Sequence, residues 1–118
     1  MKSRIFTILA FGVLVAGLAS LVACSSETEA TTAEVKLPTL QCESCSQTVE
    51  TALKKVDGLK SVEVDLEAKT AKVTFAAKVT NVPALELAVA NAGYAANDKK
   101  ADPEAYEKLA ECCKVSDQ

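Results

Sequence analysis

Histidine and tryptophan are both absent from this sequence of 118 residues. Without histidine, the chain has neither the most common catalytic base nor an imidazole ligand for a metal ion. Basic residues are fewer than acidic ones, 13 against 16, and the formal charge of −3 gives no support for a nucleic-acid surface. Any chemistry must therefore come from cysteine or carboxylate side chains.

The carboxylates do not form an obvious catalytic pair. Glu63, Asp65 and Glu67 alternate with apolar residues along one predicted strand, which is the pattern of a solvated sheet face. The length and the apolar content of 49% predict one small domain with extensions, too small for a large multi-step enzyme. We therefore expect a binding protein and not an enzyme, with no nucleic-acid partner.

The cysteines are odd in number, which requires an explanation. One of the five stands near the N-terminus, two are three positions apart near the middle, and two are adjacent near the C-terminus: Cys24, Cys42, Cys45, Cys112 and Cys113.

The N-terminal segment, residues 1–23, has the pattern of a signal peptide. Lys2 and Arg4 precede an uncharged, mainly apolar run from Ile5 to Ala23. The last four residues, Leu21-Val22-Ala23-Cys24, resemble the lipobox of bacterial lipoproteins, in which the cysteine is lipidated and becomes the new N-terminus. The alternative is an uncleaved transmembrane anchor, because nineteen residues at about 1.5 Å each can just span a hydrocarbon core of about 30 Å.

Both interpretations predict an extracytoplasmic, membrane-anchored protein, in the periplasm or on the cell surface of a bacterium. Removal of residues 1–23 lowers the number of basic residues from 13 to 11 against 16 acidic ones, a formal charge of −5. Binding to anionic lipid through a basic patch is then even less favoured, so the membrane contact is expected through the lipid on Cys24. Residues 24–33 are small and polar without apolar periodicity, which predicts a flexible tether.

The central feature is the motif Cys42-Glu43-Ser44-Cys45, placed where the hydrophobic period changes. The alternation of Val35-Lys36-Leu37 before it predicts a strand. After it, apolar residues recur at helical spacing from Cys45 to Val56. The two thiols therefore lie on a loop that runs into a helix, where the positive end of the helix dipole favours thiolate, the form that binds a soft metal ion.

The domain is expected over residues 34–97, in the order βαββαβ. Asp57-Gly58 ends the first helix, a hairpin turns at Ala68-Lys69, and Thr80 or Asn81 caps a second helix that Gly93 closes. This order predicts a ferredoxin-like α+β sandwich, a four-stranded antiparallel sheet with both helices on one face. The first three strands and the second helix are predicted from their apolar residues, which are Val35 and Leu37; Val62, Val64 and Leu66; Ala71, Val73 and Phe75; and Leu85, Ala88, Val89 and Ala92. A short last strand is expected over residues 94–97.

With these elements in place, residues 34–97 resemble a heavy-metal-associated domain. This module occurs in copper chaperones, in the tails of copper and zinc P-type ATPases and in periplasmic mercury-binding proteins. Cys42-Glu43-Ser44-Cys45 stands at the family's CxxC, residues 56–62 resemble its turn into the second strand, and Ala92-Gly93-Tyr94 resembles its loop beside the metal. The family usually has Gly-Met-Thr before the first cysteine, where this chain has Thr39-Leu40-Gln41.

The resemblance implies that Cys42 and Cys45 bind the ion, that Leu40 forms the apolar plug under the loop, and that Tyr94 lies near the thiolates. Simple packing is the alternative role for Tyr94. The resemblance also implies a partner with its own thiol pair, such as a metal-transporting P-type ATPase or an efflux component. Two thiolates in linear or bent geometry suit Cu(I) and Hg(II), whereas zinc prefers four ligands. We expect capture and transfer of a soft ion, with Cu(I) first and Hg(II), Zn(II) or Cd(II) as alternatives.

The C-terminal extension, residues 98–118, carries the second cysteine pair. Asp102-Pro103-Glu104 is a typical helix start, and Tyr106, Leu109, Ala110 and Cys113 then follow at helical spacing. If this helix packs on the domain, Cys112 and Cys113 are available to complete a four-thiolate Zn or Cd site or to supply a third ligand for Cu(I). The other possibilities are an independent metal-binding tail pair and a disulfide between the tail and the loop.

A thiol-disulfide redox protein is the rival interpretation of a CxxC outside the cytoplasm. Thioredoxin-like proteins also place this motif at a helix start. The sequence argues against that class because it has no tryptophan, no proline between the cysteines, and a predicted hairpin where a second βα crossover is needed.

Overall fold

The structure is a computed structural model that describes residues 29–115 of the chain. The predicted signal peptide and Cys24 lie outside this range. Among the described residues, no helix has the length and apolar character needed to cross a membrane.

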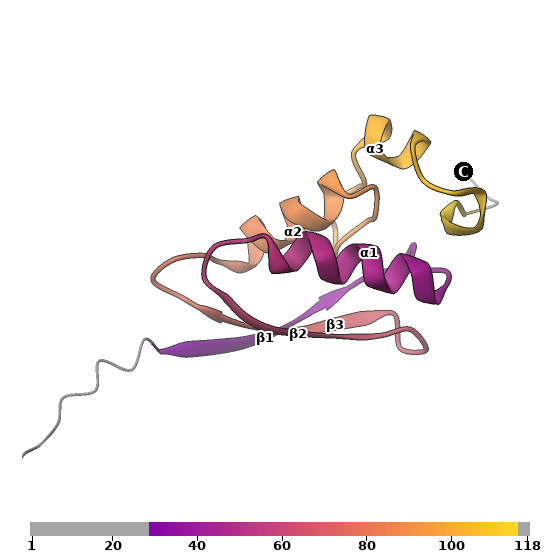
Figure 1. The fold of residues 1–118 in the computed structure, drawn as a ribbon. Coiled ribbons are helices and arrows are strands. Elements are labelled where there is room, and N and C mark those ends of the chain that lie inside the picture. The colour runs from indigo at the N-terminus through magenta and orange to yellow at the C-terminus, as the bar shows by residue number, and fades with distance from the viewer. Residues whose placement is uncertain (1–28, 116–118) are drawn as a thin grey trace, which may run out of the picture.

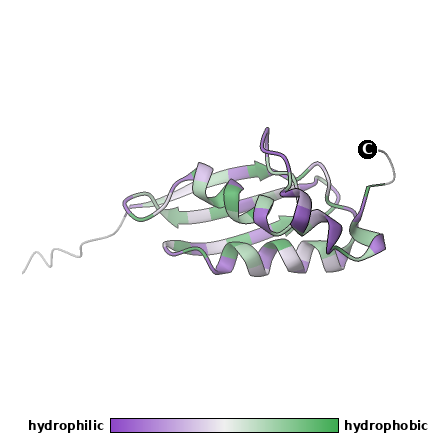
Figure 2. Cartoon of the chain, turned by 90° about the horizontal axis from the view of Figure 1, so that it is seen from above, coloured by the Kyte–Doolittle hydropathy of each residue, from purple (hydrophilic) through white to green (hydrophobic). Residues whose placement is uncertain are grey.

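The core of the fold is an antiparallel sheet covered on one face by two helices (Figure 1). The strands are β1 (Ala30–Lys36), β2 (Leu59–Asp65) and β3 (Thr70–Ala76), in the spatial order β1-β3-β2. The helices are α1 (Glu43–Lys54) and α2 (Val82–Asn91), which lie side by side over the sheet when seen from above (Figure 2). The ferredoxin-like sandwich predicted from the sequence is confirmed.

The alternation of side chains explains why one face of the hairpin is covered and the other is wet. Along β3, Ala71, Val73 and Phe75 are buried, while Lys72 between them is exposed. In β2, Glu63 is exposed and lies opposite Lys72 in the register. The turn that joins the two strands is held by the Asp65 carboxylate, which accepts a hydrogen bond from the Ala68 N–H at 2.9 Å. The hairpin predicted around Ala68-Lys69 is therefore confirmed.

The helix ends follow the capping signals of the sequence. Asn81 is the N-cap of α2, and its side-chain oxygen accepts a hydrogen bond from the Ala84 N–H at 3.0 Å. Helix α1 buries the stripe Cys45, Val49 and Leu53 against the sheet. Gly58 then adopts a φ of +89°, which L-residues rarely adopt.

The fourth strand expected over residues 94–97 is not formed within the described part of the chain. The Asn97 N–H donates to the Lys36 carbonyl at 2.8 Å, and the Lys36 N–H donates to the Asn97 side chain at 2.9 Å. Asn97 has a φ of +50°, and Ala96 pairs with Lys99 in an isolated bridge. The chain thus contacts the edge of β1 only at Asn97 and then turns away. The Asn97 side chain accepts the hydrogen bond from the Lys36 N–H that a backbone carbonyl of a fourth strand would otherwise accept.

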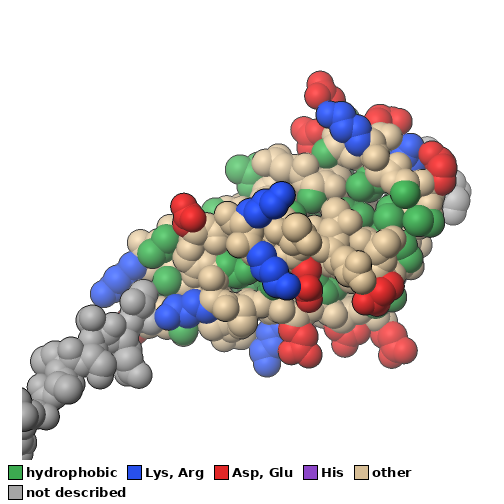
Figure 3. Space-filling model, in the orientation of Figure 1, with side chains coloured by type: hydrophobic (Ala, Val, Ile, Leu, Met, Phe, Trp, Pro, Cys, Tyr) green, Lys and Arg blue, Asp and Glu red, His purple; other side chains and the backbone are tan. Residues whose placement is uncertain are grey.

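The start of the domain also differs from the expectation. β1 begins at Ala30 and pairs with β3 from Ala30 opposite Ala76 onward, so the last residues of the expected tether at 24–33 belong to the sheet. On the face drawn in Figure 3, lysine and acidic side chains are interspersed over the described residues, and neither sign forms a continuous patch there.

The C-terminal extension folds back onto the domain, but it is not the continuous helix predicted from the spacing of Tyr106 and Cys113. Helix α3 (Pro103–Glu107) is short, Ala110 is extended, and a single 3₁₀ turn, η1 (Glu111–Cys113), follows. The Tyr106 hydroxyl accepts from the Val115 N–H at 3.1 Å and closes this segment on itself. The break lets both Leu109 and Cys113 pack against the core cluster.

Candidate metal centre

The motif lies at the N-terminus of α1, as the change of period predicted. Cys42 is the N-cap residue in extended conformation, and its carbonyl accepts a hydrogen bond from the Ser46 N–H at 3.1 Å. Cys45 is in the first turn and is fully buried, whereas Cys42 is half-buried. One sulfur is therefore part of the core and the other borders solvent.

The Cys42 thiol has an environment that favours its ionised form. The Ser44 hydroxyl oxygen lies 3.1 Å from the Cys42 sulfur. This hydroxyl lowers the pKa of Cys42, and the backbone N–H of Cys45 lowers it further. The effect expected from the helix start is thus present, and a hydroxyl adds to it. The Ser44 role was missed from the sequence, although a hydroxyl two positions after the first cysteine is the available signal.

The tail brings its cysteines to the same place. Cys113 is only 5% exposed and forms a disulfide with Cys45, across a Cα–Cα distance of 5.9 Å. Cys112 is exposed, and its sulfur lies 4.0 Å from that of Cys113. Of the possibilities left open for the tail, docking on the domain and a disulfide between tail and loop are both present.

Four sulfur atoms from two distant segments therefore converge. The Cys42 sulfur is 2.9 Å from that of Cys45 and 3.7 Å from that of Cys113. The sulfurs of Cys42, Cys112 and Cys113 all lie within 4.8 Å of one another. Thiolates are soft ligands and select Cu(I), Zn(II) and related thiophilic ions over Mg(II) or Ca(II). The donor set therefore fits a soft metal ion.

Two residues singled out beside the CxxC are both buried in the core. Leu40 is fully buried, and its N–H donates to the Leu37 carbonyl at 3.0 Å, which fixes the loop before Cys42. Tyr94 is fully buried, and its hydroxyl has no hydrogen-bond partner within the described chain. Burial raises the pKa of Tyr94, the nearby Thr48 hydroxyl, which does not meet hydrogen-bond geometry, partly offsets this, and Cys42 and Cys112 raise the pKa further. The tyrosine is therefore a neutral donor close to the sulfurs.

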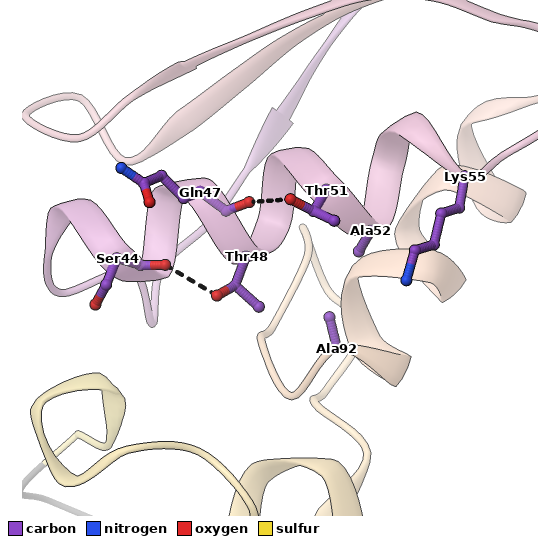
Figure 4. A pocket seen from close by; sticks show the side chains of 7 residues that line it. All are labelled: Ser44, Gln47, Thr48, Thr51, Ala52, Lys55 and Ala92. Carbon is purple, nitrogen blue, oxygen red and sulfur yellow. Dashed lines mark hydrogen bonds between the residues drawn. The ribbon is translucent and has the colours of Figure 1, made fainter.

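An open groove runs from the motif along α1. Its lining includes Ser44, Thr48 and Lys55 on the helix and Ala92 at the end of α2, and it has a volume of about 530 Å³ (Figure 4). The Thr48 hydroxyl donates to the Ser44 carbonyl at 2.9 Å. The groove leaves the Ser44 side of the motif accessible beside the tail.

Comparison with known proteins matches residues 34–95 to the heavy-metal-associated domain. The chain belongs to the heavy-metal-associated domain family. One relative is the mercuric transport protein periplasmic component of Shewanella putrefaciens, 46% identical over 63 residues that cover 53% of this chain and 69% of the relative.

Solved structures of this domain family agree with the fold. The crystal structure of oxidized MerP from Ralstonia metallidurans CH34 has a TM-score of 0.57 and 36% identity, covering 58% of this chain and 96% of that one. A copper binding domain of a P-type ATPase has a TM-score of 0.55 and 27% identity, covering 56% and 89%. The match to the family ends at residue 95, so the cysteine-bearing tail lies beyond the matched heavy-metal-associated domain.

Proposed function

We propose that this protein captures a soft metal ion through Cys42 and Cys45 and passes it to another thiol pair, as a carrier and not as an enzyme. The observation that carries the proposal is the position of the two cysteines at the start of α1, one buried and one bordering solvent, with their sulfurs 2.9 Å apart. A half-exposed pair of this kind can exchange its ion through an intermediate shared with an incoming thiolate.

The ion that we propose first is Hg(II). From the sequence alone we expected Cu(I) first. The relative with 46% identity is, however, a mercuric transport protein, and the MerP structure is 36% identical to this chain. The copper binding ATPase domain is 27% identical. Two thiolates suit either ion. Cu(I) remains the second candidate because that copper binding domain has the same fold.

The location that we propose is extracytoplasmic, in agreement with the periplasmic relative and with the predicted signal peptide. Lipidation of Cys24 and anchoring to the membrane stay predictions from the lipobox resemblance. Mass spectrometry of the protein purified from membranes checks them, because a mature chain that begins with diacylated Cys24 has a defined mass. A partner such as a metal-transporting ATPase or an efflux component is likewise a proposal, supported by the ATPase domain of the same family.

The experiment is a competition titration of the fully reduced protein under anaerobic conditions, with Hg(II) and Cu(I) in separate series. Cys42→Ser and Cys45→Ser are expected to lose at least tenfold in affinity, because each leaves one thiolate of the pair. Leu87→Ser, on the half-exposed surface of α2, is the control for an added serine and should bind like the wild type. Equal affinity in all four proteins would refute the assignment of the site to the CxxC pair.

A further inference from the structure

The structure places the tail cysteines where they can act on the metal site itself. Cys113 lies 3.7 Å from Cys42, and Cys112 lies 4.0 Å from Cys113, both measured between sulfur atoms. A tetrahedral thiolate site with bonds of about 2.3 Å has neighbouring sulfurs about 3.8 Å apart. The Cys113 sulfur therefore stands at such a separation from the sulfurs of Cys42 and Cys112, whereas its disulfide with Cys45 must be reduced before a closed site can form.

The docking of the tail is fixed by several contacts besides the sulfurs. The Asp102 N–H donates to the Ala90 carbonyl at 2.9 Å and attaches the start of α3 to the end of α2. Leu109 packs on the core cluster, and Cys113 belongs to that cluster. Gly93 provides the space, because a Cβ at this position would lie 3.0 Å from the Ala105 carbonyl oxygen. The approach of Cys113 to the motif thus follows from the packing of the whole tail.

Cys45 and Cys113 form a disulfide, whereas Cys42 and Cys112 are free thiols. Reduction of the disulfide therefore makes the Cys45 and Cys113 sulfurs available as metal ligands as well. One thiolate of a dithiol reductant attacks one sulfur, a mixed disulfide forms, and the other sulfur leaves as a thiolate. The second thiol of the reductant then releases the first sulfur. The reductant becomes a cyclic disulfide, and Cys45 and Cys113 each gain one electron and become free thiols.

We propose that in the reduced protein Cys112 and Cys113 join Cys42 and Cys45 as ligands of one ion, which gives a closed site of four thiolates. This inference rests on the proposed function, because it adds two ligands to the same CxxC pair. Four thiolates around a divalent ion leave a net negative charge that needs nearby donors. The Ser44 hydroxyl is available for that role, because it lies 3.1 Å from the Cys42 sulfur and 3.7 Å from the Cys113 sulfur. The buried Tyr94 hydroxyl, which has no hydrogen-bond partner within the described residues, is a second donor for it.

Cadmium is the probe, because its X-ray absorption fine structure reports how many sulfurs surround the ion. The reduced wild type, loaded with one Cd(II) per chain, is expected to show about four sulfur neighbours. Cys112→Ser and Cys113→Ser should each show about three, and the double variant about two, with oxygen ligands in place of the lost sulfurs. The charge-transfer absorbance per bound Cd(II) should fall in the same order.

The outcomes separate this inference from the proposed function. If the double variant keeps the sulfur number of the wild type, the tail does not ligate and the inference fails, although binding by the CxxC pair stands. If the wild type binds no Cd(II), Hg(II) or Cu(I), both proposals fail. Two chains sharing one ion would also give four sulfurs, but at one Cd(II) per two chains and with a dimeric mass in light scattering, and that result would overturn the inference.

Discussion

Reduction of the disulfide between Cys45 and Cys113 should lower the free energy of unfolding by about 4 kcal/mol. The two residues are separated by 68 positions, and the loop-closure entropy of a cross-link of this length in the unfolded chain amounts to about 4 kcal/mol at 25 °C. Because urea unfolding of a small domain has a slope of about 1–2 kcal/mol per molar, the midpoint should fall by about 2 to 4 M.

The measurement is urea unfolding followed by far-ultraviolet circular dichroism, since the chain has no tryptophan for fluorescence. The oxidised and phosphine-reduced proteins are compared, and the oxidised state is confirmed by peptide mapping. The double variant Cys112→Ser/Cys113→Ser is the matched control, because the Cys112 sulfur also lies within 4.8 Å of the Cys42 sulfur and would otherwise be able to replace Cys113 in a cross-link. Its oxidised form has Cys42–Cys45 as the disulfide option at the motif, a loop of three positions whose closure contributes only about 1 to 2 kcal/mol.

The result that refutes this reasoning is a small shift in the wild type. If reduction moves the midpoint of the wild type and of the double variant by the same amount, the tail is not cross-linked to the loop. A large shift that persists in the double variant would also contradict the pairing. A large shift in the wild type that is reduced by half or more in the variant supports it.

Three further changes test the positions of the tail and of the residues around the sulfurs. Gly93→Ala, at a φ of +97° and 3.0 Å from the Ala105 carbonyl oxygen, should cost at least about 1–2 kcal/mol and speed proteolysis of the tail, whereas Gly58→Ala should destabilise without exposing the tail. Tyr94→Phe removes a buried hydroxyl that has no partner in the described chain, so the metal-free protein should keep or gain stability while the metal-loaded protein loses affinity severalfold. Asp102→Ala removes the hydrogen bond from the Ala105 N–H at 2.9 Å and should cost about 1 kcal/mol in the docking of the tail, measured by amide exchange of residues 103–113.

The domain could be predicted from the sequence because its signals are local. The alternation around Val73, the capping by Asn81 and the stripe of Val49 each depend on a few neighbouring residues, and the structure shows each of them. The position of the CxxC at the start of α1 follows from the same local pattern. Elements of this kind need only the period of the apolar residues and the residues at their ends.

The features that were not predicted depend on contacts between distant residues. The spacing of Tyr106 and Cys113 fits a helix, but the helix of the tail is interrupted at Ala110. The interruption allows Leu109 and Cys113 both to pack on the core and allows Cys113 to form its disulfide with Cys45. The fourth strand failed in the same way, since Asn97 uses its side chain on Lys36. For the site, the sequence supplied all four sulfurs but left several pairings open, because no local pattern relates Cys113 to a loop 68 positions earlier.

The tail has one buried residue, Cys113, next to a helix, α3, that buries none of its residues. This difference suggests how a closed site releases its ion. Cys113 is 5% exposed and held in the core, but α3 has no buried residue and Cys112 is exposed. Segments with few buried apolar contacts open locally at a small cost in free energy. We therefore expect the exposed part of the tail, α3 and Cys112, to open before the sandwich unfolds, which would leave Cys42 and Cys45 accessible to an acceptor thiolate. A site of four thiolates that opens to two retains its ion between encounters and transfers it during one.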